Sequence, residues 1–177
     1  MDLPEIGVFI PQDARDQAMA ARLAAFLARE PAAFGRDPAT GHVTGSAVVV
    51  NPARDKIVMT HHARLGRWLQ LGGHCDGIRD PRFVALKEAY EESGLPRIDP
   101  LGSAILDIDI HEIPARGNEP AHLHYDLRYL FEAAEAPLLV SRESTALAWV
   151  PLAQLEDFST APSVLILREK LGRSLRD

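Results

Sequence analysis

Residues 71–95 read LGGHCDGIRDPRFVALKEAYEESGL, and the interpretation of the whole chain starts from this stretch. It predicts a glycine-rich turn followed by a helix over residues 81–93. Asp80 can cap the helix N-terminus, Pro81 suits the first helical position, and Gly94 suits a left-handed residue after the last turn. One sharply delimited helix is therefore expected directly after a Gly-Gly turn.

Three glutamates share one side of this predicted helix. At about 100° per residue, Glu88, Glu91 and Glu92 fall within an arc of roughly 100°. Partly buried, such a group must be protonated or must hold a cation, and an oxygen-only set suits Mg²⁺ or Mn²⁺. The Gly72 carbonyl can add a ligand because glycine lets the backbone come close. The competing interpretation is a solvated acidic face, balanced by Lys87 four residues before Glu91.

The spacing of residues 73–95 resembles the Nudix box, a signature of a glycine, a glutamate, an arginine–glutamate pair, two further glutamates, a glycine and an aliphatic residue. The positions in register are Gly73, Glu88, Glu91, Glu92, Gly94 and Leu95. Lys87 stands where the family has arginine and Arg79 where it has glutamate, so the ion pair common at those positions cannot form. We expect Asp76 or Asp80 to replace the missing acid, or Arg79 to face a substrate phosphate.

The segments around the box alternate between β-rich runs and helices. Strands are predicted over residues 42–51, 56–62, 67–73, 103–113, 121–133 and 146–152, and helices over 12–30 and 163–175. This order predicts an α+β protein with a mixed sheet between helices. The resemblance covers about residues 43–172 and implies the Nudix fold. We divide the chain into an N-terminal helical extension and connector, residues 1–40, and a Nudix hydrolase domain, residues 41–177.

The resemblance implies a metal-dependent pyrophosphohydrolase that cleaves a nucleoside diphosphate linked to another moiety, such as a nucleotide sugar or ADP-ribose. Glu88 and the pair Glu91–Glu92, with the Gly72 carbonyl, would hold Mg²⁺, with Mn²⁺ as an alternative. The ion would neutralise diphosphate oxygens and lower the pKa of a water. Candidate catalytic residues are Glu92, Glu91 and Glu143, the last lying before the predicted strand that contains a tryptophan.

Six further residues are candidate substrate contacts: His74, Arg79, Arg116, His122, His124 and Asp126. The first two lie in the box loop, and Arg116 lies between prolines, where it can clamp a phosphate or simply be solvated. The last three alternate on one face of the predicted strand 121–133, opposite an apolar face. Such a face either lines a polar or metal site, or pairs with polar side chains of neighbouring strands.

Composition limits the classes of partner. The net charge of −6 argues against a nucleic-acid or anionic-membrane binder that works by bulk attraction. The single cysteine, Cys75, allows neither an internal disulfide nor a cysteine-based zinc cage. No signal peptide or bilayer-spanning run is recognised, so we expect a cytoplasmic protein that binds a small nucleoside diphosphate derivative and can form a homodimer.

Two other functions compete with hydrolysis. A Nudix-fold ligand sensor with little or no turnover is favoured by Arg79 and Lys87, which depart from the signature. An isomerase acting on an isoprenoid diphosphate also uses this fold, but the position of Cys75 within the box loop argues against it. A screen for phosphate release separates the hydrolase from the sensor.

Overall fold

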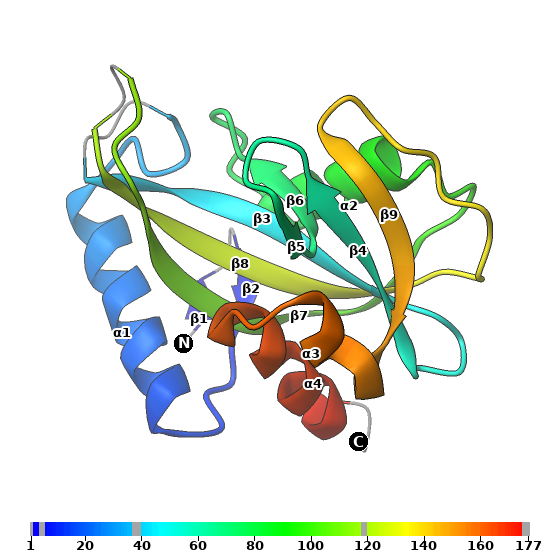
Figure 1. Ribbon diagram of the computed structural model, residues 1–177. Helices are drawn as coiled ribbons and strands as arrows, with labels where there is room; N and C mark the ends of the chain where they lie inside the picture. The colour runs from blue at the N-terminus through cyan, green and yellow to red at the C-terminus, as the bar shows by residue number, and fades with distance from the viewer. Residues whose placement is uncertain (1, 4–5, 37–39, 118–119, 175–177) are drawn as a thin grey trace.

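The computed structural model describes residues 2–3, 6–36, 40–117 and 120–174 (Figure 1). Its helices are α1 (Ala14–Arg29), α2 (Pro81–Ser93), the 3₁₀ turn η1 (Leu152–Gln154), α3 (Leu155–Phe158) and α4 (Pro162–Ser174). Its strands are β1 (Asp2–Leu3), β2 (Gly7–Val8), β3 (Gly41–Val50), β4 (Lys56–His62), β5 (Arg67–Leu69), β6 (Leu71–His74), β7 (Asp99–Ile113), β8 (His122–Glu132) and β9 (Ser144–Pro151).

A mixed sheet of seven strands forms the centre of the molecule. Its main path runs β5-β4-β3-β8-β7, with β3 and β8 parallel and the other neighbours antiparallel. β6 pairs with residues 44–47 in the middle of β3, whereas β4 meets β3 only at Val50 and pairs along its length with β9. The sheet therefore forks beside β3, and the two branches are β6 on one side and β4 with β9 on the other (Figure 1).

The two faces of β3 belong to two hydrophobic cores. Val43, Ala47 and Val49 pack in a core that includes residues of α1 and α2. Val48 and Val50 pack in a second core with residues of α3 and α4. Since successive strand residues point to opposite faces, β3 is buried on both sides, and the sheet lies between helices as the sequence predicted.

Most predicted elements are confirmed, and the differences have local causes. The central helix occupies residues 81–93 as predicted, and the N-terminal helix is two residues shorter at its start and one at its end. The predicted strand 67–73 is two strands, because the chain changes its pairing partner from β4 to β3 at Gln70. β7 begins four residues before the prediction, with irregular pairing around Pro100 and Ile105.

Helix α1 packs into the same core as the sheet. Its Leu23 and Phe26 are buried there, and the Phe26 ring stacks on Tyr125 of β8 at 3.9 Å between centroids. Asp13 caps the helix by accepting a hydrogen bond from the Asp16 amide. The N-terminal extension is therefore integrated with the domain that follows it.

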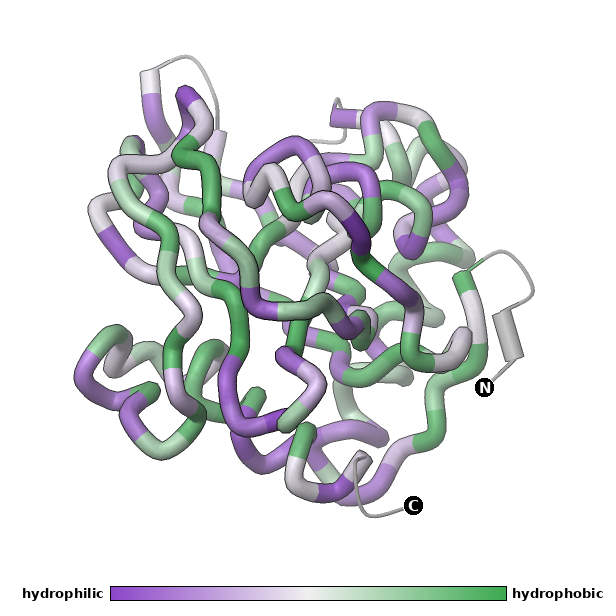
Figure 2. The backbone as a smooth tube through the Cα atoms, turned by 90° about the vertical axis from the view of Figure 1, so that its right-hand side faces the viewer, coloured by the Kyte–Doolittle hydropathy of each residue, from purple (hydrophilic) through white to green (hydrophobic). Residues whose placement is uncertain are grey.

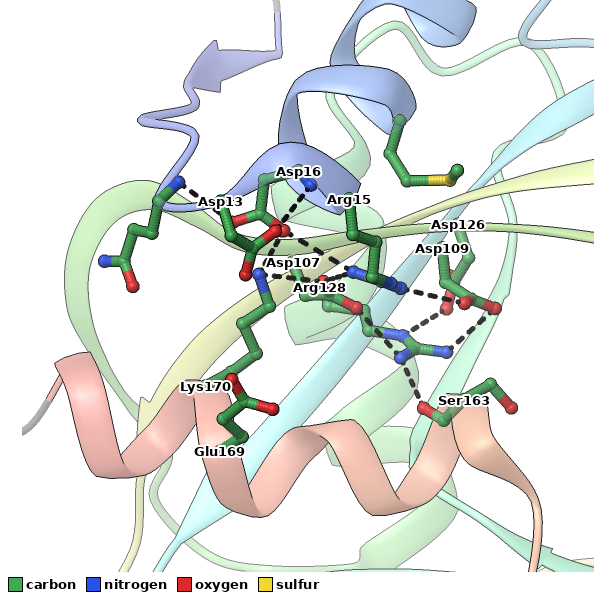
Figure 3. Close-up of polar contacts among 12 residues, drawn as sticks. Asp13, Arg15, Asp16, Asp107, Asp109, Asp126, Arg128, Ser163, Glu169 and Lys170 are labelled. Atoms are coloured by element: carbon green, nitrogen blue, oxygen red, sulfur yellow. Dashed lines mark hydrogen bonds and ion pairs between the residues drawn. The ribbon is translucent and has the colours of Figure 1, made fainter.

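A buried ionic network links α1, α4 and two strands of the sheet (Figure 3). At its centre Arg128 of β8 contacts the carboxylates of Asp107, Asp109 and Asp126. Its other charged members are Arg15, Asp16 and Lys170. The side chain of Arg128 is only 2% exposed, so its charge is compensated by carboxylates and not by water.

Figure 2 shows hydrophobic and hydrophilic stretches alternating at short intervals along the backbone. In keeping with this pattern, none of the helices within the described residues has the length and apolar character needed to cross a bilayer.

Candidate active site

Helix α2 carries the three glutamates and is fixed at both ends. The Asp80 side chain accepts a hydrogen bond from the Phe83 amide at 3.0 Å, and Pro81 starts the helix. At the other end Gly94 adopts φ 67°, and its amide donates to the Tyr90 carbonyl. These local signals, all readable in the sequence, fix the helical frame on which the glutamates are spaced.

Glycines let α2 approach the sheet closely. A β-carbon on Gly45 of β3 would lie 2.2 Å from the Pro81 carbonyl oxygen at the start of α2. A β-carbon on Gly73 of β6 would lie 2.7 Å from the carboxyl carbon of Glu88. The Gly72 amide donates a hydrogen bond to the Glu92 carboxylate at 3.2 Å. Gly72 and Gly73, which lie in strand β6 and not in a turn, are therefore in direct contact with the acidic helix face.

The three glutamates differ in exposure and in partners. The side chains of Glu88 and Glu91 are 19% and 58% exposed, and the Lys87 ammonium donates to both, at 3.1 and 2.7 Å. Glu92 is 8% exposed. One ammonium group thus lies between two of the carboxylates, and the third is held by the backbone of β6.

Burial raises the pKa of Glu92 to about 8. The hydrogen bond from Gly72 acts in the opposite direction, and the charges of Glu88, Glu143 and Glu91 raise the pKa further. A carboxyl group in this position carries a proton at neutral pH unless a cation neutralises the surrounding charge. The three glutamates therefore lie in the structure as the sequence predicted, in an arrangement that favours either a protonated carboxyl group or a bound cation.

Glu143 lies in the turn before β9, beside the β4 side of the fork. Its side chain is exposed, and its backbone carbonyl accepts a hydrogen bond from the Ala63 amide, which ties the turn to the end of β4. Its charge acts on Glu92 and on His62. The structure thus brings Glu143 within electrostatic range of the glutamates of α2.

The loop between β6 and α2 is tied to the segment after α1. Asp76 bonds to Arg36 in a bidentate ion pair, and the Gly77 amide donates to the Phe34 carbonyl. The Arg79 guanidinium lies over the Phe34 ring, 5.0 Å from its centroid. Asp76 therefore orders the loop through Arg36, which was not anticipated from the sequence.

The candidate substrate residues do not form one group. Arg116 is exposed in the connection between β7 and β8. His122 lines a cavity of about 570 Å³ between α1, β7 and β8, together with Phe26 and Tyr125. His74 and His124 lie near each other, with ring centroids 5.1 Å apart.

The carboxylate of Asp126 has several hydrogen-bond partners within the protein. It is 2% exposed, and it accepts hydrogen bonds from the hydroxyls of Thr44 and Ser46, from the Gln70 amide and from Arg128. These contacts favour the interpretation of a polar face that pairs with neighbouring strands, and the role of Asp126 as a substrate contact stays a prediction.

Two histidines near the candidate substrate residues were not predicted from the sequence. His42 at the start of β3 and His111 near the end of β7 both lie beside His124, with ring centroids 4.6 and 5.6 Å away. The only signal for them in the sequence was the histidine alternation in β8. Their proximity depends on which strands pair, and a single sequence does not show this.

Comparisons with known proteins gave structural matches only. No family model and no curated protein matches the chain. RenU, a Nudix hydrolase from M. smegmatis, aligns with a TM-score of 0.55 and 21% identity over 77% of this chain and 87% of its own. A C. elegans Ap4A hydrolase aligns with a TM-score of 0.55 and 14% identity, over 76% of this chain and 97% of its own. The Nudix domain of Shewanella oneidensis NrtR, in complex with ADP ribose, aligns with a TM-score of 0.53 and 20% identity, over 86% of this chain and 97% of its own.

These likenesses show that the chain has the Nudix fold. The predicted α+β class and mixed sheet between helices are thereby confirmed. At such identities the alignments establish the fold and leave the chemistry to the residues of this chain.

Proposed function

We propose that this chain is a Nudix hydrolase that uses a divalent cation to cleave the diphosphate of a small nucleoside diphosphate derivative. The observation that carries the proposal is the packing of the acidic face of α2 against Gly72 and Gly73 of β6. There Glu92 is buried beside two further glutamates and its pKa is raised to about 8. Such a concentration of carboxyl groups is costly unless it has a ligand.

The donor set fits a hard cation. Glu88, Glu91 and Glu92 offer carboxylate oxygens, the donors that Mg²⁺ and Mn²⁺ prefer. The Lys87 ammonium, in contact with two of them, shows that a positive charge is accommodated there. The Gly72 carbonyl is the proposed backbone ligand. A bound Mg²⁺ would supply neutralisation of the diphosphate charge and a water of lowered pKa.

The protein's own residues supply proton transfer and orientation. Glu92 is the proposed base, because its buried carboxyl group lies against the Gly72 amide, beside the two other glutamates that would hold the ion. Glu143 is the alternative base, since it is exposed and acts electrostatically on Glu92. Glu91 is the most exposed of the three helix glutamates and is a second candidate. Arg79 is the proposed contact for a substrate phosphate, held in place by its stacking over Phe34.

The substrate class is proposed from the resemblance to the Nudix box, with nucleotide sugars and ADP-ribose first. Solved neighbours include an Ap4A hydrolase and a domain in complex with ADP ribose, so nucleotide derivatives are the compounds to test. A cytoplasmic location and a homodimer remain predictions from the sequence.

The test is a screen for hydrolysis products, read as newly formed phosphorylated fragments or pyrophosphate, over nucleotide sugars, dinucleotides and nucleoside triphosphates with Mg²⁺ or Mn²⁺. We expect Glu92→Gln to lower kcat by about 10²–10⁴-fold if it is the base. Glu91→Gln should raise the Mg²⁺ concentration needed for half-maximal rate. Glu169→Gln is the matched control, because Glu169 is also an exposed helix glutamate paired with a cation four residues away.

Two results would count against hydrolysis. Absence of turnover on every compound, with ADP-ribose or another nucleotide still binding, would favour the ligand sensor. Turnover that is unchanged in both Glu91→Gln and Glu92→Gln would place the chemistry elsewhere in the protein.

A further inference from the structure

Five of the seven histidines of the chain gather on one face of the sheet. In the strand register His42 of β3 pairs with His124 of β8, and His124 pairs in turn with His111 of β7. His74 of β6 pairs with Thr44, two residues from His42, and therefore points to the same face. His122 lies two residues before His124 on that face. We call these five residues the histidine cluster.

The core of the cluster contains ring nitrogens that have no hydrogen-bond partner. His42 is 2% exposed, and neither of its ring nitrogens has a hydrogen bond. The Nε2 atom of His124 is also buried and also has no hydrogen bond. A buried polar atom without a hydrogen bond is unfavourable, so these nitrogens are candidates to bind a ligand.

The spacing of the nitrogens suits one ion. Each of His42, His74 and His124 offers a ring nitrogen, and these atoms lie within 4.8 Å of one another. A tetrahedral zinc with Zn–N bonds of about 2.0–2.1 Å needs nitrogens about 3.3 Å apart, so small side-chain rotations bring all three into range. We propose that His42, His74 and His124 bind a transition-metal ion of the Zn²⁺ type.

The electrostatics of the cluster favour the ligand form of the ring. Burial, reinforced by the neighbouring histidines, lowers the pKa of His42 to about 4 and that of His124 to about 2. Both rings are therefore neutral at pH 7 and keep a lone pair for a metal. Imidazole nitrogen suits Zn²⁺, Co²⁺, Ni²⁺ or Cu²⁺, and not Mg²⁺.

The two outer histidines are oriented by hydrogen bonds of the kind found around metal sites. The Nδ1 atom of His111 lies 2.9 Å from the Asp109 carboxylate, and Asp109 also contacts Arg128. The Nδ1 atom of His122 lies 2.9 Å from the Pro120 carbonyl. Such bonds fix the ring and its tautomer. The His122 ring, 5.0 Å from that of His42, stands close enough to provide a fourth nitrogen.

This site is separate from the carboxylates of α2. Gly73 faces Glu88, as its close approach to that side chain shows. His74 is the next residue of β6, so its side chain points to the opposite face of the strand. The proposal therefore does not depend on the hydrolase function and can be tested without it.

The test is a titration of metal-free protein with Zn²⁺ in excess Mg²⁺, followed by calorimetry, and a parallel titration with Co²⁺, followed by its visible absorption. We expect one Zn²⁺ per chain, a rise of Tm with Zn²⁺, and a four-coordinate Co²⁺ spectrum. In His42→Phe and His124→Phe the affinity should fall at least about 100-fold, since a ligand is lost. Phenylalanine keeps an aromatic ring of similar size, so both variants should fold.

Controls separate this site from other metal sites. His61→Phe should bind Zn²⁺ like the wild type, because His61 lies outside the cluster and bonds to Thr145. The double variant Glu91→Gln/Glu92→Gln should also bind normally. His124→Cys should retain binding and add a thiolate-to-Co²⁺ charge-transfer band, which a packing role would not produce.

Two results would overturn the proposal. One is a failure of the folded wild type to bind Zn²⁺ or Co²⁺, which would make the cluster a packed polar core. The other is binding that is lost in the glutamate double variant but kept in His42→Phe, which would assign the ion to the carboxylates.

Discussion

Arg128 offers the sharpest test of how the sheet tolerates buried charge. Its guanidinium donates to Asp126 at 3.0 Å, to Asp107 at 3.1 Å and to the Ser163 carbonyl at 2.6 Å, and it lies 3.3 Å from Asp109 (Figure 3). In Arg128→Leu these carboxylates lose their shared cation while remaining largely buried. Removing one partner of a buried ion pair costs about 3–5 kcal/mol.

For a chain of this size, about 3–5 kcal/mol corresponds to a fall in Tm of roughly 6–20 °C. The measurement is urea unfolding at pH 7, read by circular dichroism, with a thermal scan as a second probe. Arg97→Leu is the control, because Arg97 pairs with Asp99 on the surface, where their side chains are 80% and 54% exposed. That pair should contribute less than about 1 kcal/mol.

Two further readouts separate burial from surface charge. Buried pairs are weakly screened, so the loss in Arg128→Leu should persist in high salt. Without Arg128, Asp107 and Asp109 still contact Arg15, whereas Asp126 loses the cation that it contacts. The carboxyls that lose Arg128 would bind protons more readily in the folded state than they do in the wild type, so the deficit in stability should shrink as pH falls towards 5. If Arg128→Leu costs no more than Arg97→Leu, or if salt abolishes its effect, our account of the network is wrong.

Three other predictions concern single positions. In metal-free protein Glu92 has its pKa raised from 4.5 to about 8, so the folded state binds an extra proton between these values. Stability should therefore fall as pH rises from about 5 to 8, and Glu92→Gln should flatten this slope in urea unfolding with a chelator present. Cys75 is 1% exposed and burial raises its pKa to about 12, so it should react with a disulfide reagent only after denaturation, and rapid labelling of native protein would contradict its burial. Gly45→Ala would place a β-carbon 2.2 Å from the Pro81 carbonyl oxygen, so it should lower the free energy of unfolding by about 3 kcal/mol. Gly172→Ala is the control, because a β-carbon there, in helix α4, would meet no atom within 4 Å. It should raise the free energy of unfolding by about 0.5–1 kcal/mol.

The sequence predicted the helix of the site because its determinants are local. Asp80, Pro81 and Gly94 lie within or beside the helix that they delimit, and the structure uses each as expected. The contact between the two glycines of β6 and the glutamates also involves residues close in sequence. The identity of the fold could therefore be inferred from one stretch of 25 residues.

The polar face of the sheet could not be predicted because its determinants are pairings between distant strands. Alternation in β8 correctly placed His124 and Asp126 opposite the apolar residues, but polar residues on one face ordinarily indicate exposure to solvent. Here that face is buried, since Asp126 meets Arg128 and the hydroxyls of β3, and His124 meets His42. Only the three-dimensional register shows that these polar groups compensate one another.

Strand β6 shows how one step along a backbone separates two kinds of ligand chemistry. Gly73 presents no side chain and so admits the Glu88 carboxylate, whereas His74 directs an imidazole to the other face. Oxygen ligands favour Mg²⁺, and nitrogen ligands favour Zn²⁺. Successive residues of a strand point to opposite faces, so the oxygen ligands and the nitrogen ligands lie on different faces of β6. The type of ligand atom, and not affinity alone, would then direct each ion to its own site. The short strand that contacts α2 in the proposed hydrolase site would then also hold the second ion, and the two proposed functions would constrain the same four residues.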